Sequence, residues 1–191
     1  MNMNKSVFAA ILVSVALPVS AFAADSYTVD PLHTFPRFRI NHLGFSTMQG
    51  RFDKTTGKVT LDRAAKSGSV ELVIETASVS TGFVKRDDHL KSPDFFNAAE
   101  FPTITYKSTA IHFKGDTPTS VDGNLTISGV TKPVTFTIEA FNCGTNPMNK
   151  KDECGADASA DIKRSDFGVK FGTPAIGDDV KLILEIEAIK E

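Results

Sequence analysis

Histidine is the residue type in this chain best suited to catalysis or metal binding, and the four histidines are His33, His42, His89 and His112. They fall in four different segments, and none has the spacing of zinc ligands, which must converge in threes or fours. Asp88 and His89 are adjacent, but neighbours on a helix point about 100° apart and seldom act as an acid–base pair. The chain also lacks the G-x-S-x-G, Ser-x-x-Lys, P-loop and G-x-G-x-x-G motifs. We therefore expect no metal site, no cofactor and no catalytic residue.

Two of the histidines lie beside other candidate binding residues. His42 shares the apolar face of a predicted strand with Phe38 and Ile40, so it is either a core histidine with satisfied hydrogen bonds or a ligand-binding group. Arg86 and His89 are three residues apart in a predicted helix and share one of its faces. Together they could contact an anionic or carbonyl head group. Alternatively, Arg86 forms a salt bridge to a neighbouring carboxylate.

That helix, around residues 84–98, is the one place where a period-two pattern clearly gives way to a helical one. Charged residues crowd its first turn, Leu90 precedes Phe95 by five positions, and Pro93 interrupts the pattern. A short helix within a run of strands usually plugs or borders the mouth of a barrel. We therefore predict that this segment, including Phe96, borders a binding site.

Most of the chain from residue 24 onward alternates apolar and polar side chains, as antiparallel strands with one buried face do. We count eight or nine strands in chain order with short turns, and we expect a bulge near 108–110, where the apolar phase changes. Such a sheet buries its apolar face and loses its edges by closing, so the sequence predicts an all-β, eight-stranded antiparallel up-and-down barrel. The short in-order turns argue against a two-sheet sandwich. The residues expected to line the interior are Phe38, Ile40, Leu72, Ile74, Tyr106, Leu125 and Phe136.

The pattern leaves open whether the barrel is hollow or filled. Eight strands enclose about enough room for one small ligand or for side chains alone. The chain has 15 phenylalanines, two tyrosines and no tryptophan. These rings either line a cavity or replace leucine in a filled core.

Residues 1–23 have the three regions of a cleaved signal peptide. A positive start ends at Lys5, an apolar run ends at Leu17, and Ala21-Phe22-Ala23 precedes the cleavage point. Residues 24–191 then fit one domain, since a domain has about 100–200 residues. The apolar run is too short for a permanent anchor, and no later stretch reaches the ~20 apolar residues that spanning needs. We expect a soluble periplasmic protein without a transmembrane segment.

The charge of the chain is nearly balanced. The full sequence has a formal net charge of −2, and the loss of residues 1–23, whose single charged residue is Lys5, makes it −3. The chain has no long tract of lysine or arginine. We therefore expect no electrostatic attraction to duplex nucleic acid or to an anionic membrane surface.

The two cysteines, Cys143 and Cys154, flank a polar loop that contains Pro147. An exported chain with two cysteines favours one disulfide. Their separation is unlike a C-x-x-C redox motif, and no nearby histidine or third cysteine supports metal binding. We expect a structural disulfide that stabilises the fold by about 3 kcal/mol through loop closure.

Several motifs resemble those of the YceI family of exported bacterial proteins. They are Phe38-Arg39-Ile40-Asn41-His42-Leu43-Gly44, Gly50-Arg51-Phe52, the run from Arg86 to Phe96 followed by Phe101-Pro102, and the run from Gly123 to Val134. The resemblance spans residues 24–191, although the cysteine pair resembles only a subgroup of the family. It implies a lipocalin-like barrel with a helical segment at one end. It also implies that the barrel holds a long isoprenoid chain, such as a polyprenyl phosphate or the tail of a ubiquinone.

The resemblance and the strand pattern together define one set of candidate ligand-binding residues: Phe38, Ile40, His42, Phe52, Leu72, Ile74, Arg86, His89, Leu90, Phe95, Phe96, Tyr106, Leu125 and Phe136. The implied function is a periplasmic carrier of an isoprenoid lipid without catalysis, and a homodimer is a candidate assembly. Two alternatives remain open. One is an enzyme acting on a small apolar substrate, which needs a titratable pair in the cavity, and the other is a filled barrel that acts through its outer surface.

Overall fold

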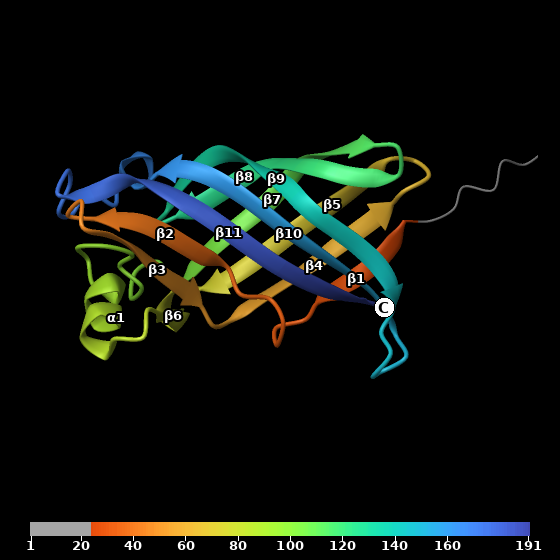
Figure 1. The fold of residues 1–191 in the computed structure, drawn as a ribbon, viewed down its shortest axis with the longest axis horizontal. Coiled ribbons are helices and arrows are strands. Elements are labelled where there is room, and N and C mark those ends of the chain that lie inside the picture. The colour runs from red at the N-terminus through yellow and green to blue at the C-terminus, as the bar shows by residue number, and fades with distance from the viewer. Residues whose placement is uncertain (1–23) are drawn as a thin grey trace, which may run out of the picture.

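The computed structural model of the protein describes residues 24–191, and the predicted signal peptide, residues 1–23, lies outside them. Over the described range the chain forms one antiparallel sheet rolled into a barrel, with one α-helix at one end (Figure 1). None of the helices in this range is long and apolar enough to cross a membrane. The strands are β1 Asp25–Val29, β2 Arg37–His42, β3 Ser46–Phe52, β4 Thr55–Asp62, β5 Ser67–Glu75, β6 Val79–Ser80, β7 Thr103–Lys114, β8 Thr117–Ile127, β9 Val130–Thr145, β10 Asp152–Lys163 and β11 Ile176–Lys190. The helix is α1 Val84–Lys91, and the short 3-10 turns are η1 Thr76–Ser78 and η2 Arg164–Phe167.

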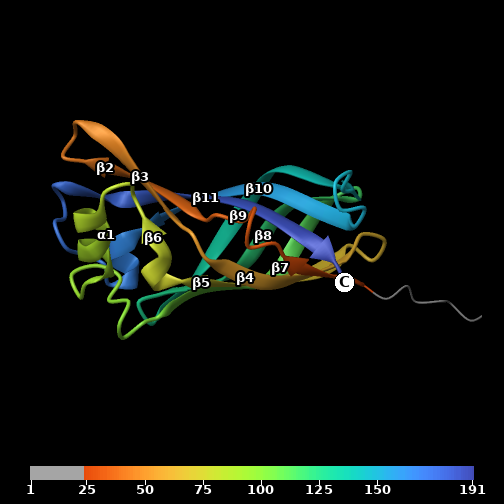
Figure 2. The same cartoon turned by 90° about the horizontal axis from the view of Figure 1, so that it is seen from below.

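Eight strands close the barrel, in the spatial order β1, β4, β5, β7, β8, β9, β10, β11 and back to β1. The predicted eight-stranded antiparallel barrel is therefore confirmed. The other three strands, β2, β3 and β6, form a ribbon attached to β11, and the β2–β3 hairpin projects from one end of the barrel (Figure 2). The strand order differs from the expected in-order arrangement at the start of the chain, because β1 pairs with β4 and not with β2.

The length of β11 explains this difference. Its first half, Ile176 to Ile183, pairs with β2, and its last residues, Ala188 to Lys190, pair with β1. Glu187 lies where the partner changes, and its carbonyl accepts the N–H of Asp30 (2.8 Å). The Glu187 N–H is satisfied by the buried hydroxyl of Thr34 (3.1 Å), which also donates to the Glu187 carbonyl (3.3 Å). A side chain thus completes the hydrogen bonding that neither neighbouring strand supplies.

The bulge predicted near residues 108–110 is present, since the register of β7 against β8 shifts between Ser108 and Ala110. The Ser108 hydroxyl accepts the N–H of Val70 on β5 (2.8 Å). It therefore satisfies a backbone donor at the point where the regular ladder is interrupted.

The regular helix is shorter than the predicted segment around residues 84–98. It ends at Lys91, with Ser92 in extended conformation as its C-cap. Pro93 has no N–H group to continue the helix, and the chain instead makes tight turns in which the N–H groups of Phe95 and Asn97 donate to the Ser92 carbonyl. These turns carry the aromatic residues of the segment back toward the barrel interior.

Cys143 on β9 and Cys154 on β10 lie opposite each other in the strand register and form the predicted disulfide. The bond closes the β9–β10 hairpin, which lies at the end of the barrel away from α1 (Figure 1). A disulfide of this kind is consistent with an oxidising, extracytoplasmic compartment.

Replacing Thr34 by Val tests the hydrogen bonding at the change of partner. Valine keeps the shape of the side chain but leaves the buried Glu187 N–H without this acceptor, so we expect the free energy of unfolding to fall by about 1–3 kcal/mol. Urea denaturation followed by circular dichroism measures this loss. The control is Thr34→Ser, which keeps the hydroxyl and should retain more stability than Thr34→Val. Equal stabilities of the valine variant and the parent would show that the hydroxyl contributes nothing.

Candidate functional site: an apolar cavity

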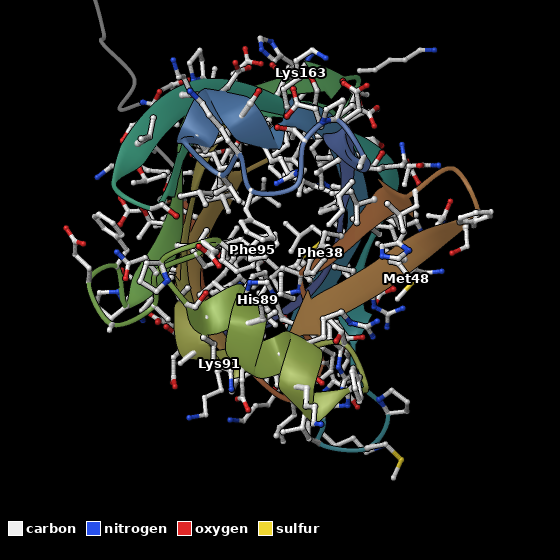
Figure 3. The ribbon with its side chains drawn as sticks, turned by 90° about the vertical axis from the view of Figure 1, so that its left-hand side faces the viewer. Phe38, Met48, His89, Lys91, Phe95 and Lys163 are labelled. Atoms are coloured by element: carbon white, nitrogen blue, oxygen red, sulfur yellow. A yellow bond between two sulfur atoms is a disulfide. The ribbon has the colours of Figure 1, made fainter. Side chains whose placement is uncertain are left out.

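The barrel encloses a cavity of about 330 Å³ at the end that carries α1. Its walls come from the strands, from α1 with the turns that follow it, and from the segment between β10 and β11. Figure 3 looks onto this end, with α1 below the opening and with Phe38, His89 and Phe95 pointing toward its centre. All fourteen predicted ligand-binding residues line the cavity: Phe38, Ile40, His42, Phe52, Leu72, Ile74, Arg86, His89, Leu90, Phe95, Phe96, Tyr106, Leu125 and Phe136. Their role in binding stays a prediction.

An aromatic cluster forms the wall between α1 and the β2–β3 hairpin. The ring centroid of Phe96 lies 6.4 Å from that of Phe38 and 5.6 Å from that of Phe52, and the Phe38 and Phe52 centroids are 6.1 Å apart. Gly50 pairs with Phe38 across the two strands, and a Cβ atom at Gly50 would collide with the Phe38 ring. The glycine therefore leaves the space that lets this ring lie against β3.

A buried ring pair forms the floor of the cavity. Tyr106 and Phe136 meet edge to face with centroids 5.1 Å apart. The Tyr106 hydroxyl lies within hydrogen-bonding distance of two carbonyls, of Val121 (2.9 Å) and of Val134 (3.1 Å), and burial raises the pKa of this phenol well above its usual range. Beyond the pair lies a smaller cavity of about 90 Å³ that shares Tyr106, Phe136 and Leu184 with the larger one. The barrel is thus hollow near α1 and nearly filled beyond the ring pair.

Three rings form the mouth of the cavity. The His89 ring of α1 lies 5.0 Å from Phe95 and 5.1 Å from Phe171, and the two phenylalanine rings are 5.3 Å apart. The Nε2 atom of His89 lies 2.9 Å from the Asp94 carboxylate. Because His89 and Phe171 are exposed as well as lining the cavity, the cavity reaches the surface between them.

Arg86 lies beside the mouth and is held in place by Thr81. Its Nε atom donates to the Thr81 hydroxyl and a terminal nitrogen donates to the Thr81 carbonyl, both at 2.7 Å. Asp87 in turn accepts the N–H (2.8 Å) and the hydroxyl of Thr81. Within the described chain the guanidinium group has no carboxylate partner of the kind that the salt-bridge alternative required. It borders the cavity with two of its three nitrogen atoms already bonded.

The segment from η2 to the start of β11 also lines the cavity, and the sequence analysis missed it. Arg164 is buried and donates to three backbone carbonyls, of Gly177 (2.8 Å), Val169 (3.1 Å) and Ile176 (3.1 Å), and burial lowers the pKa of its guanidinium group. Phe167 and Val169 fill the space beside it. The segment has no apolar periodicity that would predict a strand or a helix. The one feature of its sequence that could have pointed to the cavity is a short run containing phenylalanine and glycine between two predicted strands.

A group of titratable residues outside the cavity also had no sequence signal. The ligand atoms of Asp30, His33 and Glu187 lie within 4.8 Å of one another. The Nδ1 atom of His33 is 2.7 Å from Asp30 and 3.8 Å from Glu187. The hydrogen bond to Asp30 raises the pKa of His33, and the charges of Asp30 and Glu187 add to this effect. The contact joins the loop after β1 to β11, which are far apart in the sequence.

The pKa of His33 is a testable consequence of that contact. Replacing Asp30 by Asn should lower this pKa toward the ordinary value of 6.5, as measured by an NMR titration of the ring protons. Since the folded-state pKa is raised above the unfolded one, the stabilisation is complete below the unfolded pKa and is lost as pH rises through the folded pKa. The control is Asp122→Asn, which removes a carboxylate that contacts a different histidine, His112, and should leave the pKa of His33 unchanged. An identical His33 pKa in the parent and in Asp30→Asn would exclude this role for Asp30.

The fold and the cavity define the protein as a small closed β-barrel with an apolar internal chamber. Residues 27–188 match the YceI-like domain, and the chain belongs to that family. It is 39% identical to a UPF0312 protein of Pseudomonas aeruginosa over 194 residues, covering 99% of this chain and 100% of the relative. It is 35% identical to protein YceI of Salmonella heidelberg over 192 residues, with the same coverage. The family resemblance seen in the sequence is therefore confirmed.

Solved structures have the same fold. Burkholderia cenocepacia BcnA matches with a TM-score of 0.69 at 27% identity, covering 83% of this chain and 98% of that one. A Campylobacter jejuni YCEI protein matches with a TM-score of 0.68 at 29% identity, covering 79% and 90%. A domain from Saccharophagus degradans, described as polyisoprenoid-binding, matches with a TM-score of 0.66 at 17% identity, covering 86% and 98%. At that identity the last likeness shows the fold alone.

Proposed function

We propose that this protein is a periplasmic carrier that holds a long isoprenoid lipid, such as a polyprenyl phosphate or a ubiquinone-like molecule, in the cavity of the barrel. The observation that carries the proposal is the cavity itself, which is lined by aliphatic and aromatic side chains and opens beside α1. The description of the Saccharophagus degradans domain as polyisoprenoid-binding supports the same ligand class. The disulfide and the signal-like sequence of residues 1–23 support a periplasmic location.

The energetics of the cavity suit an apolar tail. Each CH₂ group that leaves water for apolar surroundings gains about 0.8 kcal/mol. A volume of about 330 Å³ lies in the range of pockets that take small ligands, about 300–1,000 Å³. The Phe38, Phe52 and Phe96 rings give the wall flat faces that can contact the methyl branches and double bonds of isoprene units. The tail therefore enters past His89 and extends toward the Tyr106–Phe136 floor.

The charged residues that line the cavity favour binding over catalysis. Among the described residues its lining includes no carboxylate and no thiol, and its ionisable groups are Arg37, His42, Arg86, His89, Tyr106 and Arg164. Arg164 and the Tyr106 hydroxyl are engaged by backbone carbonyls. An enzyme acting on an apolar substrate would need an acid and a base placed together at the reacting atoms. The basic groups at the mouth instead suit an acidic or carbonyl head group.

Replacing Ile40 by Trp tests the cavity as the lipid site. Ile40 lines the cavity and is only partly buried, so the indole ring can extend into the chamber and displace part of a tail. Loss of space for two CH₂ groups corresponds to about tenfold weaker binding of a prenol to delipidated protein, measured by calorimetry. The control is Val73→Trp, at an exposed position of β5, which should bind like the parent. Extraction and mass spectrometry should also find less co-purified lipid in Ile40→Trp, and equal binding by both variants would refute the site.

Replacing His89 by Gln tests the polar end of the site. Glutamine keeps a hydrogen-bonding group of similar reach but removes the titratable ring, so a head-group contact predicts weaker retention of lipid with little change in melting temperature. Retention is measured by extraction and mass spectrometry, and melting by circular dichroism. If the variant retains lipid like the parent yet melts at a much lower temperature, His89 serves the structure of the mouth and does not contact the head group.

A further inference from the structure

Exposed apolar side chains gather around the mouth of the cavity. Eight large apolar residues of the described chain are exposed, and five of them lie on three segments at this end: Leu43 (48% exposed), Phe45 (89%), Phe83 (54%), Val84 (72%) and Phe171 (46%). We call these segments, residues 43–46, 81–85 and 170–176, the mouth rim. Leu43, Phe45, Phe83 and Val84 do not line the cavity, so the lining of the cavity does not account for their exposure.

The mouth rim is one continuous surface. The N–H of Leu43, at the tip of the β2–β3 hairpin, donates to the carbonyl of Ala175 (3.1 Å). The Phe171 ring contacts His89 of α1 at 5.1 Å, and Arg86 ties α1 to Thr81. In Figure 3, α1 and the β2–β3 hairpin border the opening from two sides. The apolar side chains therefore surround the route by which a tail would enter.

The local charge of the rim differs from that of the whole chain. Its three segments contain two lysines, Lys85 and Lys170, and no carboxylate. Of the acidic residues that follow the rim, Asp88 pairs with Lys91 at 3.2 Å and Asp94 lies 2.9 Å from His89. Asp87 accepts hydrogen bonds from Thr81, the residue that also binds Arg86, so its negative charge lies near a positive one. The near-neutral total charge therefore conceals an apolar surface that carries positive charge at its edge.

We propose that the mouth rim docks on an anionic phospholipid surface, so that a tail passes between the bilayer and the cavity without crossing water. The inference rests on the proposed lipid-binding function and assigns the place where lipid is exchanged. Exposed phenylalanine, leucine and valine side chains favour the interface of a bilayer, and flanking lysines attract its anionic head groups. A second copy of this chain is a poorer occupant. A symmetric dimer through this face would bring the lysines of both copies into one interface, and the rim segments contain no carboxylate to pair with them.

Vesicle sedimentation tests the docking directly. The probe is a vesicle of equal parts phosphatidylcholine and phosphatidylglycerol, mixed with the full-length mature protein. The double variant Phe45→Ser, Val84→Ser should bind about tenfold more weakly or worse, because it removes two exposed apolar anchors. The matched control is Met148→Ser, a residue that is 90% exposed on the β9–β10 hairpin away from the mouth, and it should bind like the parent. Each of Lys85→Gln and Lys170→Gln should weaken binding about fivefold and reduce the preference for anionic vesicles.

The same samples separate this inference from the proposed function. Co-purified lipid is measured by extraction, and the rim variants should retain it because their changed residues lie outside the cavity lining. Rim variants that sediment with vesicles like the parent would overturn the docking while leaving lipid binding intact. A parent that binds vesicles through the rim yet carries no isoprenoid would refute the proposed function alone. Rim substitutions that abolish a dimer in analytical ultracentrifugation without changing vesicle binding would assign the rim to a second copy and overturn the inference.

Discussion

Strand β11 pairs with β2 along its first half and with β1 at its end, and the shape of the cavity follows from this change of neighbour. Both neighbours pair with the same edge of β11, and the Thr34 hydroxyl accepts the Glu187 N–H at the point where one replaces the other. Because β2 pairs there, the β2–β3–β6 ribbon leaves the closed ring and widens one end of the barrel. That end must be covered by other segments, and α1 with its following turns and the η2 segment supply the cover. The opening, its aromatic wall and its rim all depend on this arrangement.

The two ends of the barrel are held together by different interactions. At the far end a disulfide joins β9 to β10, and short hairpins connect the strands. At the mouth the contacts are aromatic rings, a guanidinium bonded to one threonine, and the buried Arg164 bonded to three carbonyls. The hydrogen bonds of Arg164 are directional and fix the path of its segment, whereas the apolar contact between the Phe95 and Phe171 rings is non-directional. The covalent constraint is therefore remote from the mouth of the cavity.

The sequence predicted what depends on local periodicity. Phe38, Ile40 and His42 face the interior as expected because alternation along a strand is a property of neighbouring residues. The closed barrel followed from the number of apolar strands and the short turns, and the Ser108 bulge from a change of phase. The family motifs added Phe52, Phe95 and Phe96, all of which line the cavity, and their role in binding stays a prediction.

What the sequence missed depends on contacts between distant segments. Thr34 meets Glu187 where β11 changes its partner from β2 to β1, and no local pattern in the sequence records that contact. Arg164 sits in a segment without periodicity, where its side chain satisfies carbonyls that a strand would have paired. The regular helix ends at Lys91 because Pro93 removes a donor; the predicted interruption at Pro93 was correct, but the predicted helical segment continued to residue 98. The same reasoning applies to Glu187, which the closed barrel brings next to the local pair of Asp30 and His33.

The Tyr106–Phe136 pair limits how deep the chamber is. The phenol is anchored to two carbonyls and the ring lies over Gly123, where a Cβ atom would find no room. This partition is therefore rigid, and it sits at a fixed depth below the mouth. Under the proposed function, a fixed depth limits the length of tail that the barrel can hold: a short tail would leave space unfilled beneath it, and a long tail would leave its excess units outside the barrel. The mouth would then also be the place where surplus length has to be sheltered.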